Sequence, residues 1–417
     1  MIKFLKQTRV IQIVLSVIIL LFCSQIGLAK TIKLGVLYPV SGGQAALGLA
    51  GVAGTMMAVE EINAKGGILG NRLECIVKDT QLKPSEALRE ARELIMKDEV
   101  YCLMGTLSSS VALQISNLAK ENKILFVVGI AASPVITEDF GHRYVFRPSF
   151  NSTAYSKTAA KIAAQWPAKK WATIASDYEY GRVVCNEFVT FLKETKPEAE
   201  IVDQLWPKMG EKDYSSYIRA LIQKKVEAVY SAVYGGFLVT FIKQAKPFGF
   251  FDKVKYISGD LGSVDLLNTL GKEVPEGLWG GCVYPFWGIK NPLKDSFDKN
   301  FHAKVSSGDL KGKILEYPST GAVFGYIGVH FLAKAIEKAG SLDTEKVIDA
   351  WEGLKMNSVV GELHMRAYDH QCMYPMWFGE TTFVPEYPFA VLKNLITFPA
   401  NQLYRTEEEV KKIRPGR

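Results

Sequence analysis

Residues 31–70 read TIKLGVLYPVSGGQAALGLAGVAGTMMAVEEINAKGGILG, and this stretch decides the fold. It begins with an apolar run of strand length at residues 32–37, and a glycine-rich turn follows at residues 41–43. A helical pattern then runs from about Leu47 to Asn63, and the pair at residues 66–67 ends it. A strand, a turn and a helix in this order predict the opening of a βαβ unit.

The same pattern repeats along most of the chain. Short, continuously apolar strands between amphipathic helices predict parallel sheets that are covered on both faces. Strands are expected at 72–78, 101–105, 124–128, 171–175, near 201, 228–231 and 254–258, and helices at 84–97, 108–121, 153–165, 180–194, 214–224, 237–245, 324–338 and 344–352.

The length of 417 residues exceeds what one hydrophobic core normally supports, which is about 250–300 residues. We therefore predict an α/β protein of two doubly wound, Rossmann-like lobes, joined by a multi-strand hinge. Residues 30–148 and 282–360 are assigned to the first lobe, and residues 149–281 and 361–417 to the second. The chain is expected to cross back near 278–285, and 361–392 is expected to be extended.

The N-terminus has the pattern of a secretory signal peptide, residues 1–29. Three basic residues precede an apolar run at 10–22, and the small residues at 27–29 predict cleavage after Ala29. Two alternatives are an uncleaved anchor and a lipoprotein attached at Cys23, although Phe22 is bulky for a lipobox. No later segment is expected to be long and apolar enough to cross a membrane, so the exported chain is expected to be soluble.

The charge and cysteine content exclude several classes of protein. Removal of the three leader charges lowers the net charge from +7 to +4, and basic residues are interspersed with acidic ones, so no nucleic-acid partner is expected. Five scattered cysteines remain without metal-like spacing, and we expect no metal or cofactor. An odd number leaves at least one free thiol, and Cys282 with Cys372 is a candidate disulfide.

Candidate binding residues follow the strands, because ligands of open α/β sheets bind beyond the carboxyl ends of the strands. This rule selects residues 41–43, 106–110, 129–134, 177–181, 232–236 and 258–262. Ser108, Ser109 and Ser110 begin a predicted helix, whose free N–H groups and dipole favour an anion such as a carboxylate. The alternative is that these serines only cap the helix.

Three residues in the second half offer complementary chemistry. Asp260 follows a strand and is suited to an ammonium group, although an aspartate there also stabilises turns. Tyr180 and Tyr234 occupy similar positions and either contact a ligand or pack with hydrated hydroxyls. A dinucleotide-dependent enzyme is disfavoured, because the first turn has no GxGxxG and no Walker lysine follows it. The chain also lacks a GxSxG elbow and a zinc motif, and no catalytic residue is predicted.

These residues resemble those of the branched-chain amino acid binding proteins of ABC importers. The similarity covers nearly all of the exported chain and is most specific in AVEEINAKGGILG at 58–70, with further matches at 32–43, 105–110, 213–228 and 361–371. The resemblance implies a type 1 periplasmic binding fold, a periplasmic location and no enzymatic activity. It further implies a monomer that captures a small molecule for permease and ATPase subunits.

The resemblance also implies roles for individual residues. Ser109 and the turn of Ala131, Ala132 and Ser133 match the first-lobe groups that hold the ligand carboxylate and part of its amine. Tyr180 and Tyr234 match two second-lobe tyrosines, and Asp260 matches the acid that pairs with the ligand ammonium. A ligand that docks on the first lobe would then be covered by closure of the second.

Three departures from the family pattern affect the ligand. Leu47 replaces an aromatic residue, and Asp260 is one methylene shorter than the usual glutamate, so the amine would lie deeper or be bridged by water. The usual first-lobe disulfide is absent, with Leu82 and Ser108 at the corresponding positions.

An apolar and aromatic pocket is expected from Leu47, Tyr180, Tyr284, Phe286 and Trp287, which favours leucine-like or aromatic ligands. Amides, urea and aromatic carboxylates remain alternative ligands, and a ligand-sensing receptor subunit remains an alternative role.

Overall fold

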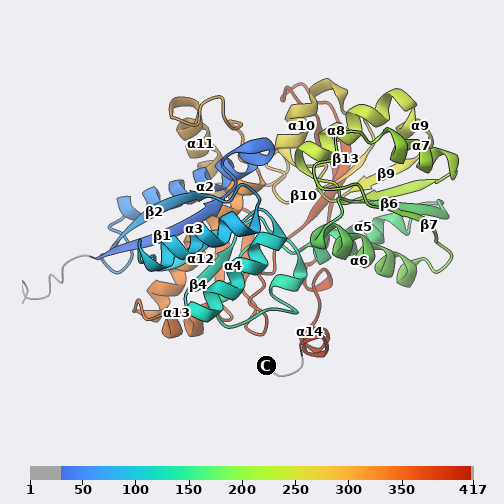
Figure 1. Cartoon of the computed structure of the whole chain (residues 1–417). Helices are drawn as coiled ribbons and strands as arrows, with labels where there is room; N and C mark the ends of the chain where they lie inside the picture. Colours follow the sequence, from blue (N-terminus) through green and yellow to red (C-terminus); the bar gives the residue numbers. More distant parts are fainter. Residues whose placement is uncertain (1–29, 415–417) are drawn as a thin grey trace, which may run out of the picture.

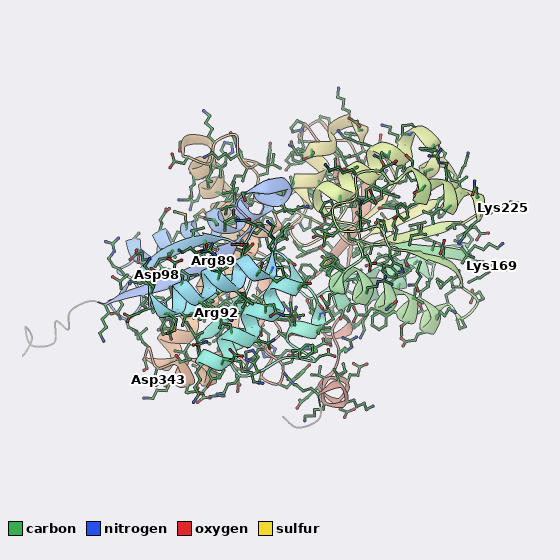
Figure 2. All side chains as sticks on the ribbon, viewed as in Figure 1. Arg89, Arg92, Asp98, Lys169, Lys225 and Asp343 are labelled. Carbon is green, nitrogen blue, oxygen red and sulfur yellow. The ribbon has the colours of Figure 1, made fainter. Side chains whose placement is uncertain are left out.

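The computed structural model describes residues 30–414, arranged as two lobes that each contain a sheet flanked by helices (Figure 1; Figure 2 shows the side chains in the same view). The predicted signal peptide, its cleavage site and Cys23 lie outside the described residues. The two-lobed α/β architecture predicted from the sequence is confirmed.

The first lobe contains a five-stranded parallel sheet in the order β2-β1-β3-β4-β5. Every residue of β3 and β4 is buried, as the apolar runs predict for strands covered on both faces. The strands are β1 (Thr31–Tyr38), β2 (Arg72–Asp79), β3 (Cys102–Gly105), β4 (Leu125–Val128) and β5 (Val145–Phe146); the helices are α2 (Ala45–Ala64), α3 (Pro84–Met96), α4 (Ser109–Asn122), α12 (Thr320–Ala339) and α13 (Thr344–Trp351).

The second lobe contains a seven-stranded sheet in the order β14-β13-β10-β9-β8-β6-β7. Its C-terminal edge is antiparallel, because β13 runs against both β10 and β14. The strands are β6 (Lys170–Ile174), β7 (Glu200–Leu205), β8 (Ala228–Ser231), β9 (Lys255–Ser258), β10 (Trp279–Cys282), β13 (Trp377–Thr382) and β14 (Val391–Thr397); the helices are α5 (Ser152–Ala163), α6 (Glu179–Thr195), α7 (Ser215–Gln223), α8 (Gly235–Ala245), α9 (Phe250–Lys253) and α10 (Val264–Leu270).

The chain passes between the lobes three times, after β5, after β10 and before β13. The first and third crossings pair with each other at Arg147 and Gln371, which joins the lobes through adjacent segments. Three features were not predicted from the sequence: α11 (Pro292–Ser307), the hairpin of β11 (Lys355–Ser358) with β12 (Gly361–His364), and α14 (Glu407–Ile413). Short 3-10 helices lie at η1 (Gly42–Gln44), η2 (Pro134–Ile136), η3 (Lys246–Phe248), η4 (Gly271–Glu273) and η5 (Ala400–Gln402).

Helices α2 and α12 lie in close contact because glycines face each other. A Cβ atom on Gly54 would lie 1.9 Å from the Ala322 carbonyl oxygen, and one on Gly325 would lie 2.4 Å from that of Gly51. Among the described residues, the stretch Gly42–Ala64 alone has the length and apolar composition of a membrane span, contrary to our expectation that none would. Its most apolar window is 61% buried in the fold, as in a core helix.

The five described cysteines are all free thiols. Cys282 and Cys372 are both buried, and the candidate disulfide between them is not formed. Burial raises the pKa of Cys282 to about 12, so this residue remains a small, protonated core side chain.

Candidate ligand-binding site

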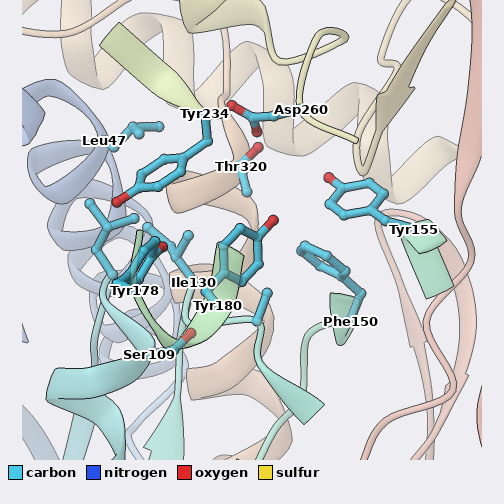
Figure 3. Close-up of a pocket in the computed structure, with 12 residues that line it drawn as sticks. Leu47, Ser109, Ile130, Phe150, Tyr155, Tyr178, Tyr180, Tyr234, Asp260 and Thr320 are labelled. Carbon is cyan, nitrogen blue, oxygen red and sulfur yellow. The ribbon is translucent and has the colours of Figure 1, made fainter. Parts of the chain in front are cut away.

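A pocket lies between the two lobes, and an interface between domains is a common place for a small-molecule site (Figure 3). Both lobes and the first crossing segment contribute to its walls. The lining residues are Leu47, Leu107, Ser109, Ile130, Ala132, Phe150, Tyr155, Tyr178, Tyr180, Tyr234, Asp260 and Thr320.

Ser109 lies on the first-lobe wall, at the first residue of α4. Its hydroxyl oxygen accepts a hydrogen bond from the backbone N–H of Ser133, at 3.2 Å. That bond occupies the oxygen as an acceptor and leaves the hydroxyl proton available to a ligand. Because the first N–H groups of α4 have no partner within the helix, this wall favours a ligand group with negative charge.

Asp260 lies across the pocket from Ser109, two residues after β9 (Figure 3). Its Oδ2 accepts a hydrogen bond from the backbone N–H of Gly235, at 2.9 Å. Burial raises the pKa of Asp260 to about 7, against the opposing effect of the Gly235 bond. Asp260 is the only acidic side chain among the lining residues, and no lysine or arginine is among them. A cationic group of the ligand would therefore stabilise the ionised carboxylate.

Aromatic rings form much of the second-lobe wall. The ring centroids of Tyr178, Tyr180 and Tyr234 lie 5.9–6.3 Å apart, and Tyr155 packs edge-on against Phe150 at 4.5 Å. The hydroxyls of Tyr155 and Tyr180 point toward the same part of the pocket as Asp260 (Figure 3). Burial raises the pKa of both tyrosines well above the usual value, so their hydroxyls stay protonated and can donate hydrogen bonds.

The two lobes approach each other closely around this pocket. Gly235, at the start of α8, has a φ of 52°, and a Cβ atom there would lie 2.7 Å from Oε1 of Gln44 in η1. On another side, the Ser133 hydroxyl donates a hydrogen bond to Oε1 of Glu179 at the start of α6. The structure thus represents an arrangement in which first-lobe and second-lobe side chains meet.

The structure brings most of the predicted site residues to one pocket. Ser109, Ala132, Tyr180, Tyr234, Asp260 and Leu47 all line it. Three others lie behind the wall: Ser108 precedes α4 without a side-chain capping bond, Ala131 is fully buried with its N–H bonded to the Thr106 carbonyl, and Ser133 contacts Glu179. The ligand contacts expected of these residues stay predictions.

Three aromatic residues predicted in the pocket lie elsewhere. The Tyr284 hydroxyl donates to Asp298 at 2.7 Å, the ring of Phe286 stacks on Tyr317, and Nε1 of Trp287 donates to the carbonyl of Leu392. The prediction that these rings form the pocket wall is wrong, because they follow β10 after the chain has turned back toward the first lobe.

Six lining residues were not singled out from the sequence. Leu107, Ile130 and Tyr178 lie within the post-strand stretches that were selected, and the rule could have identified them. Phe150 belongs to the crossing after β5, Tyr155 to the first turn of α5, and Thr320 to the start of α12. No strand-end signal marks these three positions.

Comparison with known proteins agrees with this architecture. The family described as periplasmic binding protein matches residues 31–383. The chain belongs to this family. Periplasmic binding proteins are solute-binding transport components rather than enzymes, and membership indicates an exported, periplasmic protein that binds a small molecule.

Curated relatives cover most of the chain at modest identity. A leucine-, isoleucine-, valine-, threonine- and alanine-binding protein of Pseudomonas aeruginosa is 26% identical over 343 residues, which is 82% of this chain and 87% of that protein. A Leu/Ile/Val-binding protein homologue of Brucella suis is 29% identical over 76% of this chain and 80% of its own length.

Solved structures confirm the fold of this periplasmic binding protein. A solute-binding protein of an ABC transporter from R. palustris, in complex with 4-hydroxybenzoate, has a TM-score of 0.80 at 23% identity, covering 89% of this chain and 97% of that one. A leucine-binding protein of Thermotoga maritima has a TM-score of 0.76 at 24% identity, covering 88% and 98%.

Proposed function

We propose that this chain is the solute-binding component of an ABC importer and that it traps an amino acid between its lobes. One observation carries the proposal: Ser109 with the start of α4 and the acid Asp260 face the same pocket from opposite lobes. A donor wall on one side and an acid on the other complement the carboxylate and the ammonium of a zwitterion.

The ligand docks on the first lobe and closure of the second lobe covers it. The carboxylate accepts hydrogen bonds from the Ser109 hydroxyl and from the N–H groups that begin α4. Closure then brings Tyr180, Tyr234 and Asp260 over the ligand, and Asp260 pairs with the ammonium. The closed monomer is the form that the permease and ATPase assembly recognises.

A branched or otherwise apolar side chain is the best match to the remaining walls. Apolar surface against which such a side chain would pack is supplied by Leu47, Leu107, Ile130 and Phe150. The substrate named for the Pseudomonas aeruginosa relative supports this class.

An aromatic carboxylate is the second candidate, in the same transport role. The tyrosine-rich wall and the R. palustris complex with 4-hydroxybenzoate favour it. Asp260 disfavours it, because a ligand without an ammonium leaves that carboxylate unpaired beside a second negative charge. Amides, urea and a sensing role have no specific support in the pocket.

Calorimetry on protein freed of bound ligand tests the proposal. The panel comprises the proteinogenic amino acids, 4-hydroxybenzoate, urea and 4-methylpentanoate, which is leucine without its amine. We expect leucine or another apolar amino acid to bind most tightly, and 4-methylpentanoate to bind far more weakly than leucine. Binding of 4-hydroxybenzoate alone would contradict the amino-acid assignment.

Export is tested separately. We propose that the signal peptide is cleaved after Ala29, so N-terminal sequencing of the periplasmic protein should begin at Lys30. A chain that retains residues 1–29 in the membrane fraction would instead support an uncleaved anchor.

A further inference from the structure

Ser133 is fully buried and forms hydrogen bonds to a pocket residue, to a crossing segment and to the other lobe. Its backbone N–H donates to the hydroxyl oxygen of Ser109, and its carbonyl accepts a hydrogen bond from Nη1 of Arg147 in the hinge. Its hydroxyl donates to Oε1 of Glu179 in the other lobe. The backbone of Ser133 thus fixes a pocket residue, while its side chain reaches across the cleft.

The carboxylate of Glu179 relies on the Ser133 hydroxyl as its hydrogen-bond donor when the lobes are together. It occupies the first turn of α6, between the pocket tyrosines Tyr178 and Tyr180. Its Oε2 is buried and has no hydrogen-bond partner among the described residues. Burial raises the pKa of Glu179; the Ser133 bond and the charge of Arg147 oppose the rise, and Asp139 adds to it.

The placement of Glu179 makes this contact sensitive to closure. Ser133 precedes η2 in the first lobe, whereas Glu179 begins α6 in the second, so opening of the cleft separates the two groups. In the open protein water would solvate the carboxylate. In the closed protein the Ser133 hydroxyl is the side-chain donor that replaces that water, since a buried carboxylate without a donor is costly.

We propose that Ser133 and Glu179 form a latch across the cleft, which holds the closed lobes around the ligand without touching it. This inference rests on the proposed function, since closure of the lobes is what retains the ligand. Ser133 is then a positioning residue. Its N–H donates to the Ser109 oxygen and so orients the Ser109 hydroxyl proton toward the ligand. Its own hydroxyl holds α6, and with it Tyr180, against the first lobe.

A double-mutant cycle on ligand affinity and release rate tests the latch. Ser133→Ala keeps the N–H bond to Ser109 but leaves the Glu179 carboxylate without its donor on closure. We expect the Kd for leucine and the dissociation rate to rise about tenfold or more. In a Glu179→Ala background the same Ser133→Ala change should alter either quantity by less than about twofold, because the contact is already absent.

Two further variants separate the latch from a structural effect. Glu179→Gln keeps an oxygen acceptor for Ser133 and removes the buried charge, so it should bind leucine at least as tightly as the natural chain. Glu194→Gln changes an exposed residue at the far end of the same helix and should leave affinity unchanged. The unfolding temperature of each ligand-free variant reports whether it folds.

The outcomes distinguish the latch from the proposed function. If leucine does not bind, 4-hydroxybenzoate serves as the probe; a natural chain that binds neither contradicts the proposed function and the latch together. If the natural chain binds but Ser133→Ala weakens binding equally in both backgrounds, Ser133 contacts the ligand directly and the latch is wrong. An unchanged affinity in Ser133→Ala would also overturn it.

Discussion

Replacement of Asp260 by asparagine removes the single acidic side chain of the pocket while preserving its shape. Asparagine can still accept the hydrogen bond from the Gly235 N–H, which is 2.9 Å long in the structure. The change therefore removes charge with little change in geometry. Its effect on ligand binding isolates the pairing of Asp260 with an ammonium group.

The expected loss in affinity is large because the ligand is enclosed. Breaking a buried ion pair by neutralising one partner typically costs about 3–5 kcal/mol. The lower limit of this range corresponds to a Kd about 150-fold higher. We expect the Kd of Asp260→Asn for leucine to rise by at least two orders of magnitude, approaching the Kd of the natural chain for 4-methylpentanoate.

Isothermal titration with both ligands provides the measurement. The exposed acid Asp252 supplies a matched control, and Asp252→Asn should bind leucine like the natural chain. For 4-methylpentanoate, which has no ammonium, Asp260→Asn should bind equally or more tightly, because a carboxyl that repels the anion has been neutralised. A variant that binds leucine within about threefold of the natural affinity would refute the ammonium pairing, since even a modest charge-assisted bond exceeds that effect.

The pH dependence has a definite sign. Because the pKa of Asp260 is about 7 in the empty pocket and the ammonium requires the ionised form, leucine affinity should fall as pH drops from 8 to 5. Asp260→Asn should lose this dependence. In the absence of ligand the raised pKa makes ionised Asp260 a cost to the folded state that grows as pH rises from about 4 toward 7. The free energy of unfolding of Asp260→Asn should thus exceed that of the natural chain at pH 8, by at most about 4 kcal/mol. The difference should be smaller if the ligand-free lobes open and water hydrates the carboxylate.

Three further predictions concern closure, the donor wall and the thiols. Gly235→Ala should weaken leucine binding a few-fold, because the added Cβ would lie 2.7 Å from Oε1 of Gln44, whose side chain must then shift, and because the φ of 52° disfavours alanine. Gly236→Ala should have little effect, because its Cβ would meet nothing nearer than 3.8 Å. Equal calorimetric affinities for the two variants would show that α8 does not approach η1 on binding. Ser109→Ala should raise the Kd about tenfold, because it removes a hydrogen bond to the ligand carboxylate. Ser110 does not line the pocket, so Ser110→Ala should leave the Kd unchanged. A larger effect of Ser110→Ala would show that the carboxylate does not bind at Ser109. Reducing agent should leave the unfolding temperature unchanged, because the described cysteines are free; a fall of several degrees would reveal a disulfide.

The elements that position the site were largely predictable from the sequence. The apolar runs that form β3, β4, β8 and β9 are bounded by turn and helix signals. A short apolar run in that setting is most simply explained as a buried parallel strand. The strand-end rule then identified Ser109, Tyr180, Tyr234 and Asp260, since the carboxyl ends of parallel strands meet at one edge.

What escaped prediction depends on how helices and strands pack within each lobe. Tyr155 is in the first turn of α5, and the direction of its ring is set by the close approach of Gly259 and Gly281, whose Cβ atoms would lie 3.2 and 2.9 Å from that ring. Thr320 reaches the pocket because α2 and α12 pack closely. These tertiary contacts leave no periodic signal in the sequence.

The antiparallel edge of the second sheet and the helix α14 likewise depend on tertiary contacts between segments that are far apart in the sequence. Arg405, just before α14, contacts Glu138 of the first lobe and Glu187 of the second, and such a bridge between distant segments has no local signature. The ring cluster of Tyr284, Phe286 and Trp287 shows the converse error, because an aromatic run after a strand was taken as pocket when it packs elsewhere.

A crystal structure of the chain with its bound amino acid tests the central claim most directly. We predict closed lobes, with the ligand nitrogen within about 3.2 Å of an Asp260 oxygen and a ligand carboxylate oxygen within the same distance of the Ser109 hydroxyl. A ligand bound outside this pocket, or bound in it with no polar contact to Asp260, would contradict the account.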